Sequence, residues 1–172
     1  MNIVFKTNRL LLRHANASDA AVLLKLVNQA DFIKYIGDKA IYTLDDAKDY
    51  IGQSFTAAHK NQGFGPYIIT LYNDVVVGVV GLYKRSALQY PDLGFALVSG
   101  FEKKGYIFEA ANVLVQNIHK LGITQLSAIT STDNMASQNV LARLGFSKVG
   151  MVVINNDKTA VNVFLLNNQS SG

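Results

Sequence analysis

The sequence contains no cysteine, few charged residues and no long apolar run. The absence of cysteine excludes disulfides, thiolate metal sites and cysteine nucleophiles. The longest apolar run, Val75–Leu82, is far shorter than a membrane span, and the residues after Met1 lack the apolar core of a secretory signal. We therefore expect a soluble cytoplasmic protein without a membrane partner.

The composition is that of a globular protein. Hydrophobic residues make up 49% of the 172 residues and charged residues 16%, which is enough apolar material to bury a core. No repeat or long linker divides the chain, so we expect one domain over residues 1–172, with its core at about 6–166 and a frayed polar tail at 167–172. The net charge of +4 suits an anionic cofactor but is too diffuse to indicate direct nucleic-acid binding.

Strand and helix patterns alternate along the chain. In order, we expect a strand at 8–13, a helix capped by Asn16 or Ser18, a helix from Thr43 to about His59, strands at 67–72, 75–83 and 93–98, a helix at 106–121, a strand at 125–130, a helix at 134–144, and strands at 146–154 and 160–166. Hairpins and helical crossovers both occur in this order, which predicts an α/β fold with a mixed central sheet of about seven strands flanked by about four helices.

The stretch Asp92–Ala111 reads as a strand, a tight turn and the start of a helix. Lys103, Lys104 and Gly105 stand where the helix begins, and a helix start can hold a pyrophosphate with its free N–H groups. The glycine spacing of Gly100–Gly105 resembles a Walker loop, but Tyr106-Ile107 replaces the required Lys-Ser/Thr, and no Gly-x-Gly-x-x-Gly occurs. The stretch is therefore either an anion site of another kind or an ordinary glycine turn.

A second marked segment runs from Ser131 to Phe146. Asp133 or Asn134 can cap its helix, and Ser137 lies one turn further on the face of Asn134. Taken alone, this pattern is also that of any well-capped helix. The three histidines, His14, His59 and His119, lack partners at metal-ligand spacing, so we assign them to structure and expect no metal.

Together, these segments resemble the GNAT (Gcn5-related) N-acetyltransferases, specifically the RimJ/RimL-like branch of ribosomal-protein-alanine N-acetyltransferases. The matching pieces are Thr7–Arg13, Tyr35-Ile-Gly37, Thr43–Ala47, Lys104-Gly-Tyr106 with Glu109-Ala110, Asn134-x-x-Ser137, and Leu144-Gly-Phe146. The resemblance extends over about residues 6–166, and its late helix is the most specific part. It implies the GNAT-like acyl-CoA N-acyltransferase fold and acetyl-CoA as cosubstrate.

The resemblance also implies roles for matching residues. Backbone groups of Phe95, Ala96, Leu97 and Val98 would pair with the pantetheine arm, and an N–H near Leu97 would stabilise the oxyanion. The pyrophosphate would be held by the N–H groups of Lys103, Lys104, Gly105, Tyr106, Ile107 and Phe108, with charge from Lys103 or Lys104. Asn134 would contact the pantetheine. Ser137 would donate to the leaving thiolate, since Leu141 stands where many members carry a tyrosine.

Two positions depart from the family pattern. The family's Arg/Gln-x-x-Gly-x-Gly/Ala becomes Glu102-x-x-Gly105-x-Ile107, which places an acidic residue and a bulky residue in the expected phosphate loop. We expect weaker but retained cofactor binding. These departures also keep a second function open, a cofactor-binding regulatory or interaction module with little or no transferase activity.

The general base is the least defined role. Asp92 is a candidate at the start of the cofactor strand, although it can also be a strand-end residue after Pro91. At pH 7 a lysine amine is neutral about once in 2,500 molecules and an α-amine about once in six, a difference of about 3.5 kcal/mol. This favours an α-amine acceptor, on a protein N-terminus or a small molecule, attacking directly in a ternary complex. The oligomeric state, a homodimer included, stays open.

Overall fold

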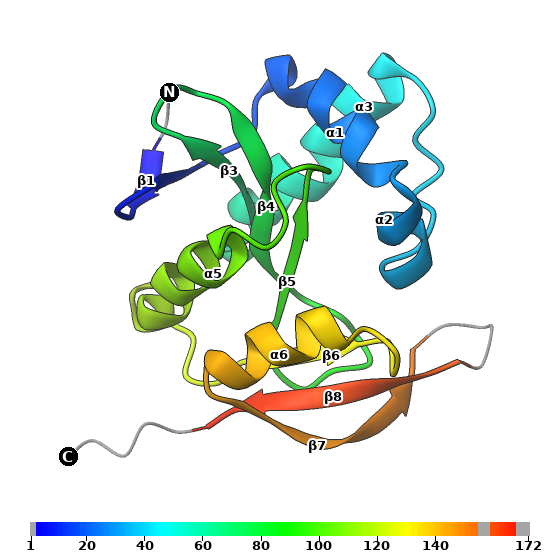
Figure 1. Ribbon diagram of the computed structural model, residues 1–172, viewed down its shortest axis with the longest axis vertical. Coiled ribbons are helices and arrows are strands. Elements are labelled where there is room, and N and C mark those ends of the chain that lie inside the picture. The colour runs from blue at the N-terminus through cyan, green and yellow to red at the C-terminus, as the bar shows by residue number, and fades with distance from the viewer. Residues whose placement is uncertain (1–2, 155–158, 168–172) are drawn as a thin grey trace.

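The strands pair into one mixed sheet, which the computed structural model places at the centre of the molecule (Figure 1). The structure describes residues 3–154 and 159–167. Within these residues the sheet has eight strands in the order β1-β2-β3-β4-β5-β6-β8-β7. Their bounds are β1 Ile3–Lys6, β2 Leu10–Arg13, β3 Pro66–Leu71, β4 Val76–Tyr83, β5 Asp92–Leu97, β6 Ser127–Thr130, β7 Phe146–Val153 and β8 Ala160–Leu166.

The expected α/β architecture with a mixed sheet is confirmed, with one more strand than expected. The extra strand is β1, which pairs antiparallel with β2 through a turn that contains Thr7 and Arg9. Its short run, Ile3–Lys6, alternates half-buried and exposed positions. The expected hairpin loop at 155–158 and the expected frayed tail fall mainly outside the described residues.

The helices of the first half form one group beside the sheet (Figure 1). They are α1 Ala20–Val27, α2 Ala30–Tyr35, α3 Leu44–Tyr50 and α4 Ala57–Gln62, with a 3₁₀ turn at Ala17–Asp19 before α1 and a π-helical stretch at Ile51–Thr56 between α3 and α4. Asn16 accepts from the Ser18 N–H, and Thr43 forms a capping box with Asp46. The helix expected from Thr43 to His59 is therefore real but changes its winding in the middle.

Two helices of the second half cover the other parts of the sheet. They are α5 Tyr106–Gln116, followed by a 3₁₀ turn at Ile118–Leu121, and α6 Met135–Arg143. The helix expected at 106–121 thus tightens in its last turn and ends at Gly122, whose φ of 72° suits glycine. None of the described helices combines the length and the hydropathy needed to cross a membrane.

Both faces of the central strands are buried. Ile68 and Val79 belong to a core shared with α1 and α3, while their neighbours Ile69 and Val80 belong to a larger core shared with α5. Alternation along β3 and β4 sends successive side chains to opposite faces. The sheet is therefore held between two helical layers, and its position relative to both is fixed.

The sheet splits between β5 and β6. Strand β5 pairs with β4 without interruption, from Tyr83↔Asp92 to Gly78↔Leu97. Its parallel contact with β6 consists of the single pair Asp92↔Ser127. Beyond that pair the two strands diverge, and β6 continues its ladder with β8 instead. The rest of β5 consequently has one open edge, which faces a gap in the sheet.

Candidate functional site

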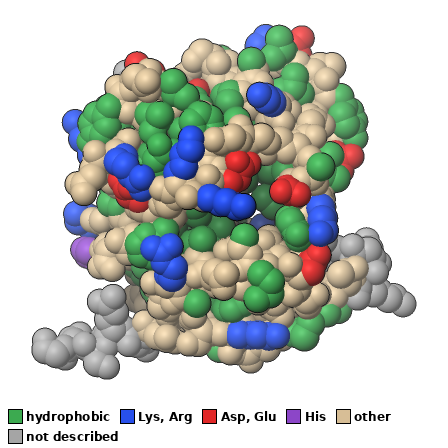
Figure 2. Space-filling view, in the orientation of Figure 1, with side chains coloured by type: hydrophobic (Ala, Val, Ile, Leu, Met, Phe, Trp, Pro, Cys, Tyr) green, Lys and Arg blue, Asp and Glu red, His purple; other side chains and the backbone are tan. Residues whose placement is uncertain are grey.

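A cavity of about 1110 Å³ opens where β5 and β6 diverge. Its walls come from α1–α3, β5, the turn after β5, the N-terminal part of α5 and one side of α6. Figure 2 shows this side of the molecule as a hollow with basic and acidic side chains around its rim. The two sequence segments expected to form the site, Asp92–Ala111 and Ser131–Phe146, both contribute to these walls.

The open edge of β5 presents only some of its backbone groups to the cavity. The Val98 N–H donates to the Val77 carbonyl at 2.9 Å, and the alternation of an antiparallel ladder then directs the groups of Ala96 towards β4 as well. The groups of Phe95 and Leu97 point to the open edge. Pairing of a ligand with Ala96 and Val98, which we expected, is therefore wrong, because β4 already occupies that edge.

Gln29, which precedes α2, closes the far end of this edge. Its Nε2 donates to the Leu97 carbonyl and its Oε1 accepts from the Ser99 N–H, both at 2.9 Å. The groups of the edge that stay available for a ligand are the N–H and carbonyl of Phe95 and the N–H of Leu97. Sequence reasoning missed Gln29 because its partners are backbone atoms about 70 residues away.

The turn after β5 leads into an N-terminus of α5 that has no side-chain cap. Three positive φ angles shape it, 96° at Gly100, 59° at Lys103 and 77° at Gly105. The first helical hydrogen bond runs from the Glu109 N–H to the Gly105 carbonyl, so within the described chain no partner is recorded for the N–H groups of Tyr106–Phe108. Such a terminus, with the helix dipole behind it, can hold an anion.

The two departures from the family pattern do not block this terminus. Glu102 Oε2 accepts from the Gly100 N–H at 2.8 Å, so the carboxylate is turned back on its own turn at the rim of the cavity. Ile107 is only 7% exposed and packs into the larger core. A bulky side chain is tolerated there because it is buried in this core.

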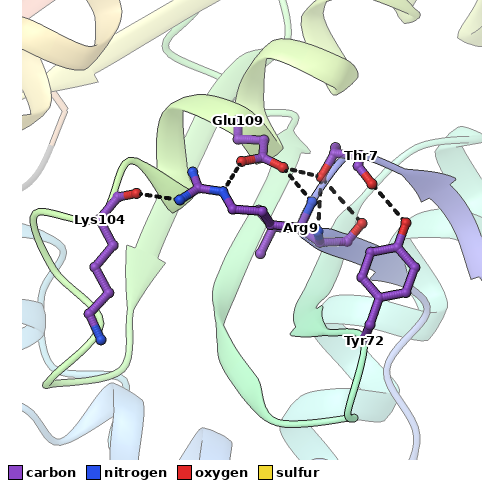
Figure 3. Close-up of polar contacts among 6 residues, drawn as sticks. Thr7, Arg9, Tyr72, Lys104 and Glu109 are labelled. Atoms are coloured by element: carbon purple, nitrogen blue, oxygen red, sulfur yellow. Dashed lines mark hydrogen bonds and ion pairs between the residues drawn. The ribbon is translucent and has the colours of Figure 1, made fainter.

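A polar network ties this turn to the β1–β2 turn (Figure 3). Arg9 donates through Nε to Glu109 Oε2 at 2.7 Å and through Nη1 to the Lys104 carbonyl at 2.9 Å. The Thr7 hydroxyl donates to Glu109 Oε1, and the Tyr72 hydroxyl donates to the Thr7 carbonyl at 2.7 Å. Burial acts to raise the pKa of Glu109, but the hydrogen bonds from Thr7 and Arg9 lower it overall, so this carboxyl stays ionised.

At the start of α6, Asn134 acts as the cap. Its Oδ1 accepts from the Ser137 N–H at 3.1 Å, and both residues line the cavity. The Asn134 Nδ2 and the Ser137 Oγ have no hydrogen-bond partner among the described residues. Leu141 is 1% exposed within the core, so it adds only apolar surface to this wall.

Asp133, the alternative cap, is used differently. Its Oδ2 lies 3.0 Å from the Nζ of Lys34 on α2, and both side chains are more than half exposed. The pair connects the first helical group to the segment before α6. Asp133 was one of the two residues that the sequence predicted as the cap of this helix.

Asp92 sits at the vertex where β5 and β6 meet. Its side chain is 1% exposed, and both oxygens accept from the Arg85 Nε, at 3.0 and 3.1 Å. Burial raises the pKa of Asp92, and the Arg85 charge offsets part of this effect. The cavity that holds Ser137 on one wall thus holds a buried carboxyl on another.

The histidines lie outside this cavity. His14 and His59 pack edge to face with ring centroids 4.4 Å apart, and the His59 Nε2 lies 2.8 Å from the Pro66 carbonyl. The two residues are thus paired although they are 45 positions apart in sequence. The part of the chain that the structure describes contains no cluster of three or more His, Cys, Asp or Glu side chains suited to a metal ion.

Comparison with known proteins places the chain among acetyltransferases. The family model described as the acetyltransferase (GNAT) domain matches residues 9–147. The chain is 23% identical over 152 residues to the uncharacterized N-acetyltransferase YoaA of Bacillus subtilis, and the match covers 87% of this chain and 85% of YoaA.

Solved structures of acetyltransferases share the fold. RimL, the ribosomal L7/L12 alpha-N-protein acetyltransferase, in its complex with coenzyme A, superposes with a TM-score of 0.81 at 20% identity, covering 95% of this chain and 97% of RimL. The ribosomal-protein-S5-alanine acetyltransferase of Vibrio fischeri superposes with a TM-score of 0.78 at 21% identity, covering 99% of this chain and all of that one. The structural neighbours thus include RimJ/RimL-like ribosomal-protein acetyltransferases.

Proposed function

Because this chain belongs to the GNAT acetyltransferase family, we propose that it transfers an acetyl group from acetyl-CoA to an α-amine, on a peptide N-terminus or a small molecule. The observation that carries the proposal is the single cavity that brings together the open edge of β5, the uncapped start of α5, Ser137 and Asp92. The first two elements suit a long, anionic cosubstrate, and the last two are the groups that could move protons during transfer.

The residues at the cavity fit acetyl-CoA in two places. The free N–H groups of Tyr106–Phe108, with Lys103 beside them on the cavity wall, suit the pyrophosphate. The free backbone groups of Phe95 and Leu97 suit an extended amide-containing arm, because such an arm can pair with an open strand edge. The Asn134 Nδ2 adds a further donor to the same wall.

Arg143 is a cation that sequence reasoning did not single out. It lines the cavity from the last turn of α6, and its guanidinium lies over the Phe108 ring, 4.1 Å from the centroid. This places a fixed positive charge beside the first turn of α5. We assign it a supporting role in holding cosubstrate phosphates.

Acetyl-CoA supplies a thioester, whose C–S bond breaks as the C–N bond to the acceptor forms. We assign a free N–H of the open edge near Leu97 to the carbonyl oxygen of that group, and the Phe95 N–H is the one that lies nearer to the Asp92 end of the strand. Ser137 donates a proton to the departing sulfur and is reprotonated from solvent, to which Asp92 later releases the proton that it takes from the amine. Asp92 accepts the proton that the amine loses, a role for which a raised pKa is favourable because it brings the base closer to neutral pH.

An α-amine is the acceptor that this set of groups can serve best. Asp92 is already shared with Arg85, whose charge offsets part of the rise that burial gives to its pKa, and an α-amine is neutral far more often than a lysine side chain at pH 7. The names of two structural neighbours, which describe ribosomal-protein N-terminal and alanine acetyltransferases, support the same acceptor class.

The test compares the two amine classes on one peptide. A peptide with a free N-terminus and a methylated lysine is compared with its Nα-acetylated counterpart that carries a free lysine, and release of coenzyme A is followed at pH 7. We expect faster transfer to the α-amine by about 400-fold if the neutral fraction alone decides. Equal rates on the two peptides would overturn the α-amine assignment. If millimolar acetyl-CoA leaves the melting temperature of the protein unchanged, the whole proposal is contradicted.

A further inference from the structure

The guanidinium of Arg85 is only partly used by the protein. Its Nε donates to both oxygens of Asp92, and its Cζ lies 6.0 Å from the centre of the Tyr83 ring. Neither terminal nitrogen has a hydrogen-bond partner in the described chain, the side chain is 39% exposed, and the residue lines the cavity. A guanidinium held by Nε alone presents its two terminal N–H₂ groups, the pair that binds a carboxylate or a phosphate.

Lys39 brings a second cation to the same place. It lies between α2 and α3 and lines the cavity, and no ion pair or hydrogen bond to another described residue involves it. Burial lowers the pKa of Lys39, and the charge of Arg85 lowers it further. Both cations line the same cavity, so an anion that binds there is attracted by both.

The surrounding groups are donors rather than acids. Tyr50 and Tyr83 line the cavity, and burial raises the pKa of both hydroxyls, so both keep their protons. The Tyr83 ring lies against Gly94, where an added Cβ would come within 2.8 Å of it. Among the acidic residues of the cavity wall, Asp92 is paired with Arg85, and no ion pair joins Asp31 to Arg85 or Lys39 within the described residues.

The position of this cluster separates it from the cosubstrate phosphates. Arg85 and Tyr83 lie at the Asp92 end of β5, while the uncapped α5 terminus follows the Leu97 end. The strand between them spans about 17 Å at about 3.3 Å per residue. A second anion-binding group at that distance serves a different part of the reacting complex.

We propose that Arg85 and Lys39 form a subsite for an acidic group of the acceptor. The preferred acceptor is then an α-amine that carries a carboxylate a few bonds away, such as a peptide that begins with Asp or Glu, or a free amino acid. The inference rests on the proposed function, since it names the substrate class of the same cavity. The shared chemistry is the carboxylate, and its two sources are separated by experiment.

Two matched acceptor pairs test the subsite. One pair is a tripeptide amide that begins with Asp and its counterpart that begins with Asn, and the other is free alanine and alaninamide. Values of kcat/KM are corrected for the neutral fraction of each amine. In one of the pairs we expect kcat/KM to be about tenfold or more higher for the acidic member, as for other charge-assisted hydrogen bonds. The pair that shows this preference identifies whether the carboxylate comes from a peptide side chain or from a free amino acid.

Variants connect the preference to the two cations. Lys39→Met, at a cavity-lining position without a hydrogen-bond or ion-pair partner in the described structure, should reduce the preference at least threefold, and Arg85→Lys should reduce it by removing the terminal N–H₂ pair. Lys60→Met, at an exposed position of α4 outside the cavity, is the matched control and should keep the preference. A preference that is the same in wild type, Lys39→Met and Arg85→Lys would overturn the assignment.

The subsite and the transferase activity can fail separately. Transfer to acidic and neutral acceptors at equal rates would overturn the subsite and leave the proposed function intact. If wild type binds acetyl-CoA but acetylates none of the four amines, the proposed function loses its support. Calorimetry with the N-acetyl-Asp and N-acetyl-Asn tripeptides in the presence of coenzyme A then decides the subsite, because equal affinities overturn it and tighter binding of the acid in wild type than in Lys39→Met supports it.

Discussion

The Nε of Arg9 lies 2.7 Å from Oε2 of Glu109, and the same guanidinium donates to the carbonyl of Lys104. The contact joins the turn between the first two strands to the turn before α5, which are about 95 residues apart in sequence. The family's usual Arg/Gln in this turn is Glu102 here, and its carboxylate is bound to the Gly100 N–H. Arg9 therefore holds the shape of a turn in which Glu102 replaces the usual Arg or Gln.

Arg9→Ala should weaken the affinity for acetyl-CoA more than it weakens folding. The side chain is 48% exposed, so its ion pair contributes about 1 kcal/mol or less to stability, but loss of the ordered turn should raise the KM for acetyl-CoA roughly three- to tenfold because the binding groups are less preorganised. Steady-state kinetics and calorimetric affinity for coenzyme A measure the effect. Arg9→Lys keeps the charge without the two-way contact, and full recovery in that variant would argue against the positioning role.

The pair Arg13–Asp19 should behave in the opposite way. Its atoms lie 2.6 Å apart with side chains 6% and 4% exposed, and Asp19 also accepts from the Asn16 N–H. Asp19→Ala leaves the Arg13 charge buried, so we expect a loss of about 3–5 kcal/mol in the free energy of unfolding. Urea denaturation measures it. Arg13→Met with Asp19→Leu removes both charges and should recover most of the loss, whereas an equally unstable double variant would show that the charge is not the cause.

The backbone elements of the site could be predicted from sequence because they rest on local signals. Thr43 with Asp46 and Asn134 with Ser137 mark helix starts within four residues, and hydrophobic periodicity marks β5 and α5. The resemblance added the order of the elements. Strand β1 was missed because its alternation extends over only four residues, a run too short to mark a strand from sequence.

The charged part of the site could not be predicted, because its partners are distant in sequence. Gln29 meets Leu97, Arg9 meets Lys104, and Lys39 and Arg85 line one cavity only after the sheet and the first helical group have packed together. No spacing rule connects such residues. The backbone assignment at Val98 was wrong for a related reason, since the register of β4 against β5 decides which groups face the cavity.

The His14–His59 pair should make stability depend on pH. Burial lowers the pKa of His14 and of His59 in the folded protein, so as pH falls below about 6.5 the unfolded chain binds protons that the folded protein does not. Stability is then fully present above that pH and is lost towards pH 5.5. We expect a melting temperature that falls by a few degrees between pH 7.5 and 5.5.

His59→Gln separates this effect from other titrations. Glutamine can still donate to the Pro66 carbonyl but does not titrate, so the melting temperature should depend less on pH in this variant. Lys60→Gln changes the neighbouring exposed residue and should keep the slope of the wild type. Identical slopes in wild type and His59→Gln would show that the pair does not contribute.

The roles of Ser137 and Asp92 make separable kinetic predictions. Ser137→Ala should lower kcat about tenfold or more and leave the affinity for coenzyme A within about twofold, because its hydroxyl has no structural partner among the described residues while its N–H, which Asn134 caps, remains.

Asp92→Asn should lower kcat/KM about 10²- to 10⁴-fold. In wild type, kcat/KM should fall as the pH is lowered. The fall should begin at a higher pH than for an ordinary aspartate, because burial raises the pKa of Asp92 and the base works only when ionised. Measuring kcat/KM from pH 5 to 9 tests this assignment: an acid limb that persists unchanged in Asp92→Asn would assign the base to another group.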